Sequence, residues 1–295
     1  MLQIDPPVRT TATDGVLLVD KPSGMTSHDV VAIARRTLHT RRIGHTGTLD
    51  PFATGLLVLL VGRATRLAQF VDDEPKVYEA TITFGVETTT DDPTGETARI
   101  AALPDTEKVD RAIEALTGQI GQRPPSYSAK KVGGQRAYAA ARAGAPLELP
   151  PVVVVVHEWR VRHRTPSALD VTITCGGGTY IRALARDLGR AAGSAAHLSA
   201  LRRVRCGVFD VAEATSFVGG DAREQPRLRP LRSAIAHLPT RQLDETALRR
   251  VQHGNSIEAE ADASLVALVD AEGDLVAIAR LEGRELRPCV VVRDA

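Results

Sequence analysis

The segment from Gly44 to Leu57, GHTGTLDPFATGLL, holds the densest group of side chains that could do chemistry in this chain of 295 residues. His45 and Asp50 can titrate, and Thr46 and Thr48 offer hydroxyl groups. Three glycines within twelve residues let the backbone approach a ligand closely or adopt positive φ angles. Loops of this composition are often functional, and Asp50 is the candidate catalytic carboxylate.

A structural interpretation stands beside the catalytic one. An aspartate before a proline commonly begins a turn, in which the carboxylate bonds its own backbone. A single histidine is most often structural. Residue types and spacing alone therefore leave the role of Asp50 open.

Apolar patterns predict the elements that would position this loop. Residues 15–20 read as a strand that enters a turn at residues 21–24, and Thr26 or Ser27 can cap the helix that follows. A buried strand is predicted directly after the loop, at residues 56–61. Further strands are predicted at residues 77–84, 152–156 and 169–174, and helices at residues 109–116 and 180–188.

The last part of the chain reads as a separate small unit. Residues 222–230 are rich in Arg, Pro, Gln and Glu without periodicity, which is typical of a connector. Beyond them the pattern predicts a helix at residues 245–252 and strands at residues 265–269, 275–279 and 289–292. A turn at Glu272-Gly273 separates the first two of these strands.

Composition excludes several classes of protein. Hydrophobic residues make up 43% and charged residues 25%, and no run approaches the roughly 18 apolar residues of a membrane span. The three cysteines are far apart and outside any C-x-x-C spacing, which argues against a disulfide framework and a zinc site. Residues 1–13 are polar and unlike a signal peptide. We therefore expect a soluble protein of the reducing cytoplasm.

The net charge of +1 is unevenly distributed. Residues 241–295 hold 7 basic and 11 acidic side chains, against 30 basic and 25 acidic in the rest of the chain. The basic excess of the first part permits a polyanionic partner such as RNA without requiring one.

Four further motifs accompany the Asp50 segment in a fixed order. They are KPSGMTS at residues 21–27, KVYEA followed by FG and DD within residues 76–95, PPSYSAKK at residues 124–131, and GTYIR followed by DLG within residues 178–189. Together the five motifs closely resemble those of the bacterial tRNA pseudouridine-55 synthases, the TruB family. They span residues 20 to about 205, which makes a chance match very improbable.

The resemblance implies a fold of the α/β (α+β) class, the pseudouridine synthase fold, with a mixed, largely antiparallel central sheet. Residues 1–239 would form the catalytic domain. Residues 240–295 resemble the small, β-rich, PUA-like RNA-contacting domain of the family. The acidic excess of this unit is unfavourable for phosphate contact, so a packing role stays open.

The resemblance also implies the reaction. In pseudouridine synthases the target uridine swings out of the RNA, its N1 glycosidic bond breaks, the base turns, and C5 is joined to the sugar. A carboxylate suits this chemistry as it suits glycosidases, and Asp50 takes that role by resemblance. Whether Asp50 attacks the sugar, adds to the base or abstracts a sugar proton stays open.

Other residues match substrate-binding positions of the family. Tyr78 matches a tyrosine that stacks on the flipped base, Tyr180 one that contacts substrate, and Arg182 the arginine that pairs with the catalytic aspartate. His45 matches a histidine that fills space in the T loop, and Leu201 an apolar residue beneath the uracil. Without the motifs, a core position for Tyr78 or Leu201 and a surface position for Arg182 would be the ordinary interpretation.

Lys21 and Lys131 match family lysines, for which we expect contact with the RNA backbone or support of a loop. Lys130 replaces the usual apolar residue of its motif, so either of the two adjacent lysines could face the RNA. The triple glycine at residues 176–178 could suggest a phosphate cradle, but no GK[ST] follows, so no nucleotide site is expected.

The resemblance implies no cofactor, the T-arm loop of tRNA as partner, no obligatory protein partner, no membrane association and a monomer. Two rival functions remain. One is a non-catalytic RNA-binding or RNA-folding protein, in which Asp50 would be optional. The other is the guide-RNA-dependent synthase of archaea and eukaryotes, which carries a longer extension before the motif at Lys21.

Overall fold

The structure, a computed structural model, describes residues 14–71, 74–127, 131–132, 135–136, 149–216, 226–260 and 263–292, with the backbone alone at 131–132 and 135–136. Within these ranges the largest sheet has nine strands, in the order β1-β3-β12-β4-β11-β10-β7 with β2 and β13 attached to β3 and β12. The strands are β1 (Gly15–Lys21), β2 (Ile43–His45), β3 (Thr54–Val61), β4 (Lys76–Phe84), β7 (Gly118–Gln122), β10 (Val152–Arg164), β11 (Ala168–Cys175), β12 (Ala196–Cys206) and β13 (Phe209–Asp210).

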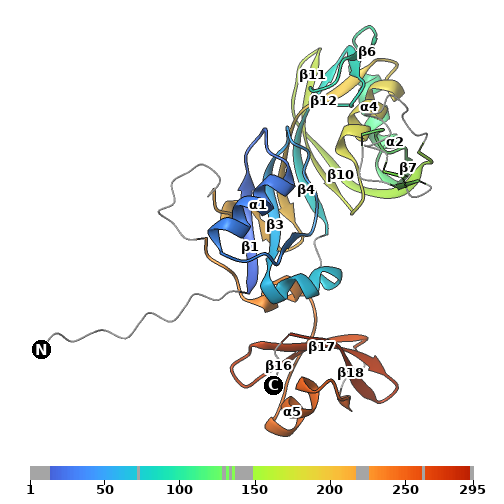
Figure 1. The fold of residues 1–295 in the computed structure, drawn as a ribbon. Helices are drawn as coiled ribbons and strands as arrows, with labels where there is room; N and C mark the ends of the chain where they lie inside the picture. Colours follow the sequence, from blue (N-terminus) through green and yellow to red (C-terminus); the bar gives the residue numbers. More distant parts are fainter. Residues whose placement is uncertain are drawn as a thin grey trace, which may run out of the picture.

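One parallel contact joins two halves of this sheet. β12 pairs with β3 in parallel through Arg202↔Thr54 and Arg203↔Gly55, and every other pairing in the sheet is antiparallel. The mixed, largely antiparallel sheet predicted by resemblance is therefore confirmed. Figure 1 shows the first half in blue around β1 and β3, and the second half around β4 in cyan and β10 and β11 in yellow-green.

The first half is buried on both faces, which explains why β3 reads as the unbroken apolar run TGLLVLLV. Helix α1 (Ser27–Thr37) packs against Leu17, Leu57 and Leu59 on one face. Its cap is Thr26, which exchanges hydrogen bonds with Asp29 in a capping box. The other face packs on two 3₁₀ segments, η1 (Gly62–Phe70) and η3 (Leu231–Ile235).

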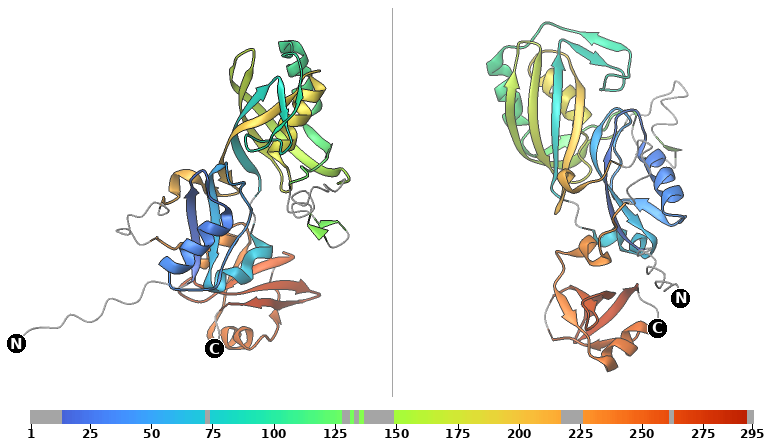
Figure 2. Two further views of the ribbon diagram at one scale, coloured as in Figure 1. Left: turned by 45° about the horizontal axis from the view of Figure 1, so that its top comes forward. Right: turned by 90° about the vertical axis from the view of Figure 1, so that its left-hand side faces the viewer.

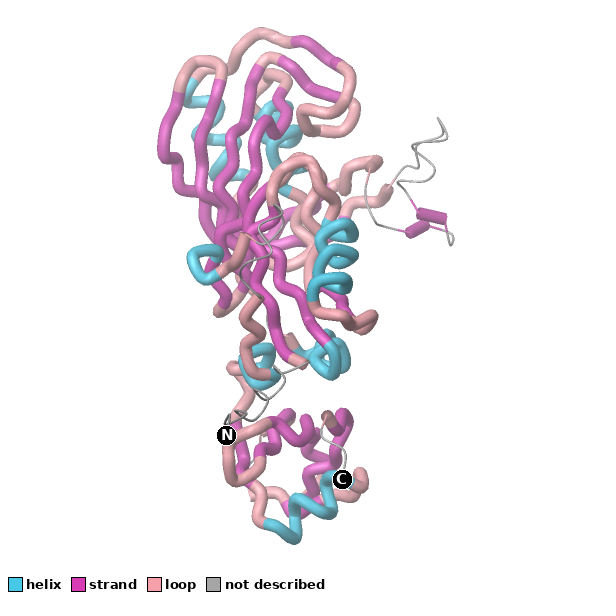
Figure 3. Tube along the Cα trace, turned by 60° about the vertical axis from the view of Figure 1, so that its left-hand side comes forward, coloured by secondary structure: helices cyan, strands magenta, loops and turns pink. Residues whose placement is uncertain are grey.

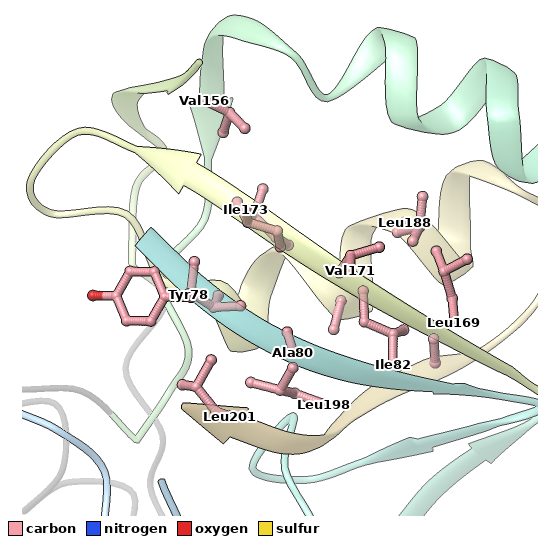
Figure 4. Packing of buried hydrophobic residues seen from close by; sticks show 14 of the residues in the cluster. Tyr78, Ala80, Ile82, Val156, Leu169, Val171, Ile173, Leu188, Leu198 and Leu201 are labelled. Atoms are coloured by element: carbon pink, nitrogen blue, oxygen red, sulfur yellow. The ribbon is translucent and has the colours of Figure 1, made fainter. Parts of the chain in front are cut away.

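The second half carries α2 (Thr106–Ala115) and α4 (Ile181–Ala191) on one face. Figure 4 shows the buried side chains of β4, β11 and β12 that share this face, among them Ile82, Val171 and Leu198. A small hairpin of β5 (Val86–Thr88) and β6 (Thr97–Ile100) lies next to β12 and leads into the segment before α2. A second hairpin pairs β8 (Lys131–Val132) with β9 (Gln135–Arg136), and η2 (Val211–Glu213) follows β13.

The C-terminal unit is a five-stranded sheet in the order β14-β16-β17-β18-β15. Its elements are β14 (Thr240–Gln242), α5 (Glu245–Gln252), β15 (Ile257–Glu258), β16 (Leu265–Val269), β17 (Leu275–Glu282) and β18 (Glu285–Val291). The predicted β-rich character is confirmed, and a domain boundary between residues 239 and 240 stays a prediction. Figures 1 and 3 show α5 on the side of this sheet that faces away from the rest of the chain.

The opposite face of the C-terminal sheet packs on the first half of the large sheet. Ala267, Leu275 and Ile278 belong to the same buried cluster as residues of β1, β3, η1 and η3. Arg63 in η1 donates from Nη1 to the carbonyl of Val292 at 2.8 Å. The two views of Figure 2 place this sheet beside the same end of the first half.

The predicted connector at residues 222–230 is in part a fixed piece of chain. Residues 222–225 lie outside the described residues. Arg229 and Val16 exchange two backbone hydrogen bonds, at 2.8 and 3.0 Å, so this stretch adds to the edge of β1. The sequence missed this contact because its cause is the free edge of a strand far away in the chain.

Candidate active site

Asp50 lies on the loop between β2 and β3, and the KPSGMTS motif holds the backbone of that loop. The hydroxyl of Ser27 accepts from the Leu49 amide at 2.9 Å and donates to the Leu49 carbonyl at 3.2 Å. The Gly24 amide donates to the Pro51 carbonyl at 2.8 Å. The residues on both sides of Asp50 are therefore fixed by backbone contacts.

Lys21 is completely buried beneath this loop. Its Nζ donates to the carbonyls of Pro22, Met25 and Pro51 at 2.9, 2.7 and 3.3 Å. Burial lowers the pKa of Lys21 to about 8, although the Asp50 carboxylate opposes this shift. Of the two tasks expected for Lys21, the contacts fit support of a loop, because a fully buried ammonium is closed to an RNA backbone.

Arg182 pairs with Asp50 through both carboxylate oxygens. Its Nε donates to Oδ2 at 2.9 Å and its Nη2 to Oδ1 at 2.8 Å. The same guanidinium donates to the carbonyls of Thr90 and Tyr127 at 2.9 and 3.1 Å. The Arg182 side chain is 6% exposed and that of Asp50 is 31% exposed, so the arginine is enclosed while the carboxylate stays open to a ligand. The pairing expected from the resemblance is present.

Arg182 begins a row of arginines at every fourth residue along α4, formed by Arg182, Arg186 and Arg190. Each arginine of this row has an acidic partner in β5 or in the turn after it. Asp92 lies 3.4 Å from Arg182 Nη1, Asp91 accepts from Arg186 at 2.9 Å, and Glu87 accepts from Arg190 Nε at 3.0 Å. The sequence showed Asp91 and Asp92 only as part of a motif and assigned them no task.

Tyr78 and Leu201 lie near each other in the sheet, and Tyr180 lies at the start of α4. Leu201 stands opposite Ala80 in the register of β12 and β4, two residues from Tyr78, and both side chains are 7% exposed. Figure 4 shows the Tyr78 hydroxyl pointing away from the aliphatic cluster. Burial raises the pKa of Tyr78 well above its ordinary value. Tyr180 caps α4, and Gln122 bonds both its amide and its carbonyl, at 2.8 and 3.1 Å.

His45 lies in β2, where it pairs with Leu59. Burial, and then the nearby Arg203 guanidinium, lower the pKa of His45 below its ordinary value, which favours the neutral imidazole. Its Nδ1 is buried and has no hydrogen-bond partner among the described residues. Only the backbone of Lys131 is described, in β8, and Lys130 lies outside the described residues.

Sequence reasoning missed Arg203, which is 2% exposed. Its Nε donates to the Leu56 carbonyl at 2.8 Å and its Nη2 to the Gly47 carbonyl at 3.0 Å. Gly55 has φ +100°, and a Cβ there would lie 2.2 Å from the Arg203 carbonyl, so glycine lets β3 close against β12. The available signal was that Arg203 follows Leu201 by two residues, so that in a strand the two side chains would lie on the same face of the sheet.

A cavity of about 560 Å³ opens where β12 and β3 separate. Phe52 and Thr54 of the Asp50 loop line it on one side, and Leu201, Glu79 and Arg162 line it on the other. Its volume lies within the range of ligand sites. Leu201 and the chain just after Asp50 thus line the cavity, whereas Asp50, Tyr78 and Arg182 are not among its lining residues. A fixed, half-open carboxylate near aromatic and apolar side chains suits chemistry on a flat base and its sugar.

Two classes of feature are missing from the described part of the chain. No cluster of three or more His, Cys, Asp or Glu side chains there could hold a metal ion. No helix in the same ranges is long and apolar enough to cross a membrane.

Comparison with known proteins gives consistent matches. The sequence model described as TruB family pseudouridylate synthase (N terminal domain) matches residues 35–181, and the one described as tRNA pseudouridine synthase II, C terminal, matches residues 238–293. A protein named tRNA pseudouridine synthase B from Thermobifida fusca (strain YX) is 46% identical over 94% of this chain and 98% of its own length. The protein of the same name from Nocardia farcinica (strain IFM 10152) is 43% identical over 98% and 96%.

Solved structures agree in fold. A chain in the crystal structure of a Cbf5-Nop10-Gar1 complex aligns with a TM-score of 0.71 at 25% identity, covering 96% of this chain and 86% of that one. A chain in an H/ACA RNP bound to a substrate RNA aligns with a TM-score of 0.70 at 24% identity, covering 95% and 85%. With relatives above 40% identity along nearly the whole chain, the protein belongs to the TruB family of pseudouridine synthases.

Proposed function

We propose that this protein converts the uridine at position 55, in the T loop of tRNA, to pseudouridine. The observation that carries the proposal is the Asp50 carboxylate: the buried Arg182 bonds both of its oxygens, and its side chain is still 31% exposed. The names of the relatives support tRNA as the substrate.

In the proposed reaction the uridine leaves the T loop and enters the site next to Asp50. The Tyr78 ring stacks on the base, Leu201 supports the uracil from below, and Tyr180 contacts the nucleotide. Asp50 assists cleavage of the N1–C1′ bond, and C5 then bonds to C1′, with loss of the C5 proton and gain of a proton at N1. A neutral His45 fills the space that the uridine leaves, because an uncharged imidazole can lie against bases at little desolvation cost.

We further propose that the protein works alone, as a monomer in the cytoplasm, with Lys131 near the RNA. The rival function is that of a guide-RNA-dependent synthase. Similarity in fold to the Cbf5 and H/ACA chains is compatible with it, but identity there is 24–25%, against 43–46% to proteins named tRNA pseudouridine synthase B.

The test uses purified protein, an unmodified tRNA transcript, and no metal, nucleotide or guide RNA, with pseudouridine mapped by chemical labelling and primer extension. We expect modification at position 55 and no loss of rate with a chelator. A transcript with uridine 55 replaced by cytidine is the control. Binding without any modification would favour the RNA-binding alternative, and modification that requires added guide RNA would favour the guide-dependent one.

A further inference from the structure

Arg203 is the largest fully buried side chain in the part of the chain that the structure describes. A guanidinium deep in a protein core is costly unless its donors are bonded. Two of those donors hold the carbonyls of Gly47 and Leu56, at 3.0 and 2.8 Å. These carbonyls lie three residues before and six residues after Asp50, so one side chain ties both ends of the loop that carries the carboxylate.

The same guanidinium also reaches Tyr78. Arg203 stands directly opposite Tyr78 in the register of β12 and β4, and its guanidinium acts to lower the pKa of the Tyr78 hydroxyl, against the larger effect of burial. The backbone around Arg203 forms the parallel contact with Gly55 that joins the two halves of the sheet. Asp50 approaches the site from the first half and Tyr78 from the second, and Arg203 stands at their junction.

We infer that Arg203 is a positioning residue of the reaction, which fixes the Asp50 loop and the Tyr78 hydroxyl relative to each other. The inference rests on the proposed function. Arg203 does not touch the substrate, because it is buried behind the loop. It acts through the Gly47 and Leu56 carbonyls that it bonds and through Tyr78, which lies opposite it in the sheet.

A guanidinium suits this task for a geometric reason. It presents five N–H donors in a rigid planar fork, so contacts in different directions are held in one fixed geometry. A lysine keeps the charge but has a single nitrogen on a flexible stem. A methionine of similar length keeps neither charge nor donors.

The decisive experiment compares Arg203→Lys and Arg203→Met with Arg205→Met. Arg205 lies on the same strand, its side chain is 56% exposed, and its ion pair with Asp210 is 3.6 Å long. Single-turnover conversion of saturating tRNA gives the rate, and filter binding gives Kd. We expect Arg203→Met to lower the single-turnover rate by roughly 100-fold, because a displacement of a catalytic group by about 1 Å can cost that much. The rate of Arg203→Lys should lie between those of the Met variant and the wild type. Kd should stay within about threefold of wild type, because phosphate contacts dominate affinity. The Arg205→Met rate should equal that of wild type.

Two readouts distinguish positioning from a general structural role. Hydrogen exchange measured by mass spectrometry should be faster at residues 46–55 in Arg203→Met than in Arg205→Met, with no change in α5. Arg203 contributes to the lowered pKa of His45, so NMR titration should show a higher His45 pKa in Arg203→Met but not in Arg203→Lys. A general folding defect would not raise the His45 pKa in the uncharged Met variant while leaving it unchanged in the charged Lys variant.

A double variant tests the path through Tyr78. If Arg203 acts in part through the hydroxyl, Arg203→Met should cost a smaller factor in a Tyr78→Phe background than in the wild-type background. Wild-type rate in Arg203→Met, or an equal loss of rate and tRNA affinity, would overturn the inference. Lack of activity in the wild-type protein would overturn the proposed function instead, and the exchange and titration measurements would still decide whether Arg203 holds the loop.

Discussion

At the scale of the residue, the site pairs a partly exposed carboxylate, Asp50, with a buried guanidinium, Arg182. Asp50 is 31% exposed and Arg182 6% exposed, and the arginine makes four hydrogen bonds, two to Asp50 and two to backbone carbonyls. The backbone contacts orient the guanidinium whether or not substrate is present. The carboxylate is therefore held ready before the uridine arrives, which lowers the reorganisation that the reaction requires.

The variant Asp50→Asn should abolish turnover and leave tRNA affinity within about tenfold of wild type, because affinity comes mainly from contacts with the RNA backbone spread over the cleft. Single-turnover assays and filter binding measure the two quantities separately. Equal loss of both would make Asp50 a structural turn residue.

The two variants of Arg182 should reduce the single-turnover rate to different degrees. Arg182→Lys keeps a charge near Asp50 but cannot bond two carboxylate oxygens and two carbonyls together, so we expect a loss of roughly 100-fold in the single-turnover rate. Arg182→Met leaves Asp50 without its partner and should be nearly inactive. A thermal melt of each variant controls for folding. A Met variant that works at the wild-type rate would show that the pairing has no part in the reaction.

At the scale of the element, the arginine row fastens α4 to the turn at residues 88–95. Asp91, which has φ +59°, and Arg186 form a pair in which both side chains are 9% exposed. The Asp91 carbonyl also accepts from the Leu198 amide at 3.1 Å, which links the turn to β12. Three elements meet at this turn, and Arg182 projects from the first turn of α4 toward Asp50.

Replacing one partner of the buried Asp91–Arg186 pair should lower the free energy of unfolding more than replacing both partners. Arg186→Met leaves the Asp91 carboxylate buried and unpaired, for which we expect a loss of about 3 kcal/mol in the free energy of unfolding. The double variant Asp91→Asn/Arg186→Met should lose less. Arg249→Met removes an exposed pair with Glu245 and should change stability by under about 1 kcal/mol. Urea unfolding measures all three, and equal losses in the single and double variants would contradict the buried pairing.

Asp91 also gives stability a pH dependence. Burial raises the pKa of Asp91 from 3.8 to about 6, against the opposing effect of Arg186. Between these values the folded protein binds the proton and the unfolded chain does not, so this contribution to stability is complete below pH 4 and is lost as pH rises through 6. The stability of the wild type relative to Asp91→Asn should therefore fall between pH 4 and pH 7 in urea titrations. A constant difference would rule out a raised pKa.

At the scale of the whole molecule, the C-terminal unit packs on the first half of the large sheet through an apolar interface that stabilises both. One face of its sheet packs on α5, and the other, with Ala267, Leu275 and Ile278, packs on the first half of the large sheet. This contact gives the acidic unit a packing role, the alternative that its charge left open. The two parts should unfold together because they share a buried cluster.

The variant Ile278→Asp tests that coupling. Ile278 is 0% exposed, and an unpaired charge there should cost at least about 3 kcal/mol. The only tryptophan, Trp159, lies in β10, in the second half of the large sheet, so its fluorescence reports unfolding far from the substitution. We expect the midpoint from Trp159 fluorescence to fall together with that from circular dichroism. Val153→Asp, at a side chain 68% exposed, should leave both unchanged. An unchanged Trp159 midpoint in Ile278→Asp would mean that the two units unfold independently.

Much of the fold follows from local sequence. The alternation of apolar residues predicted β4, and a β-branched run predicted β11, each within one residue at both ends. The segment before Val30 contained the cap of α1. The Asp50 loop was identified by its composition, and its partner Arg182 by resemblance to the family. These signals lie in neighbouring residues, where side-chain period and capping act directly.

The tertiary structure alone decided the rest. β12 was not predicted, because its sequence AHLSALRRVRC lacks strand propensity, and its conformation comes from pairing with β4 and β3. The charged part of β10 was missed for the same reason. The burial of Lys21 and Arg203 was also hidden, since both residue types are usually exposed. Asp50 and Arg182 are 132 residues apart in the chain, and Leu56 and Arg203 are 147 apart. Contacts at such separations depend on how the strands are ordered in the sheet, which no local pattern in the sequence specifies.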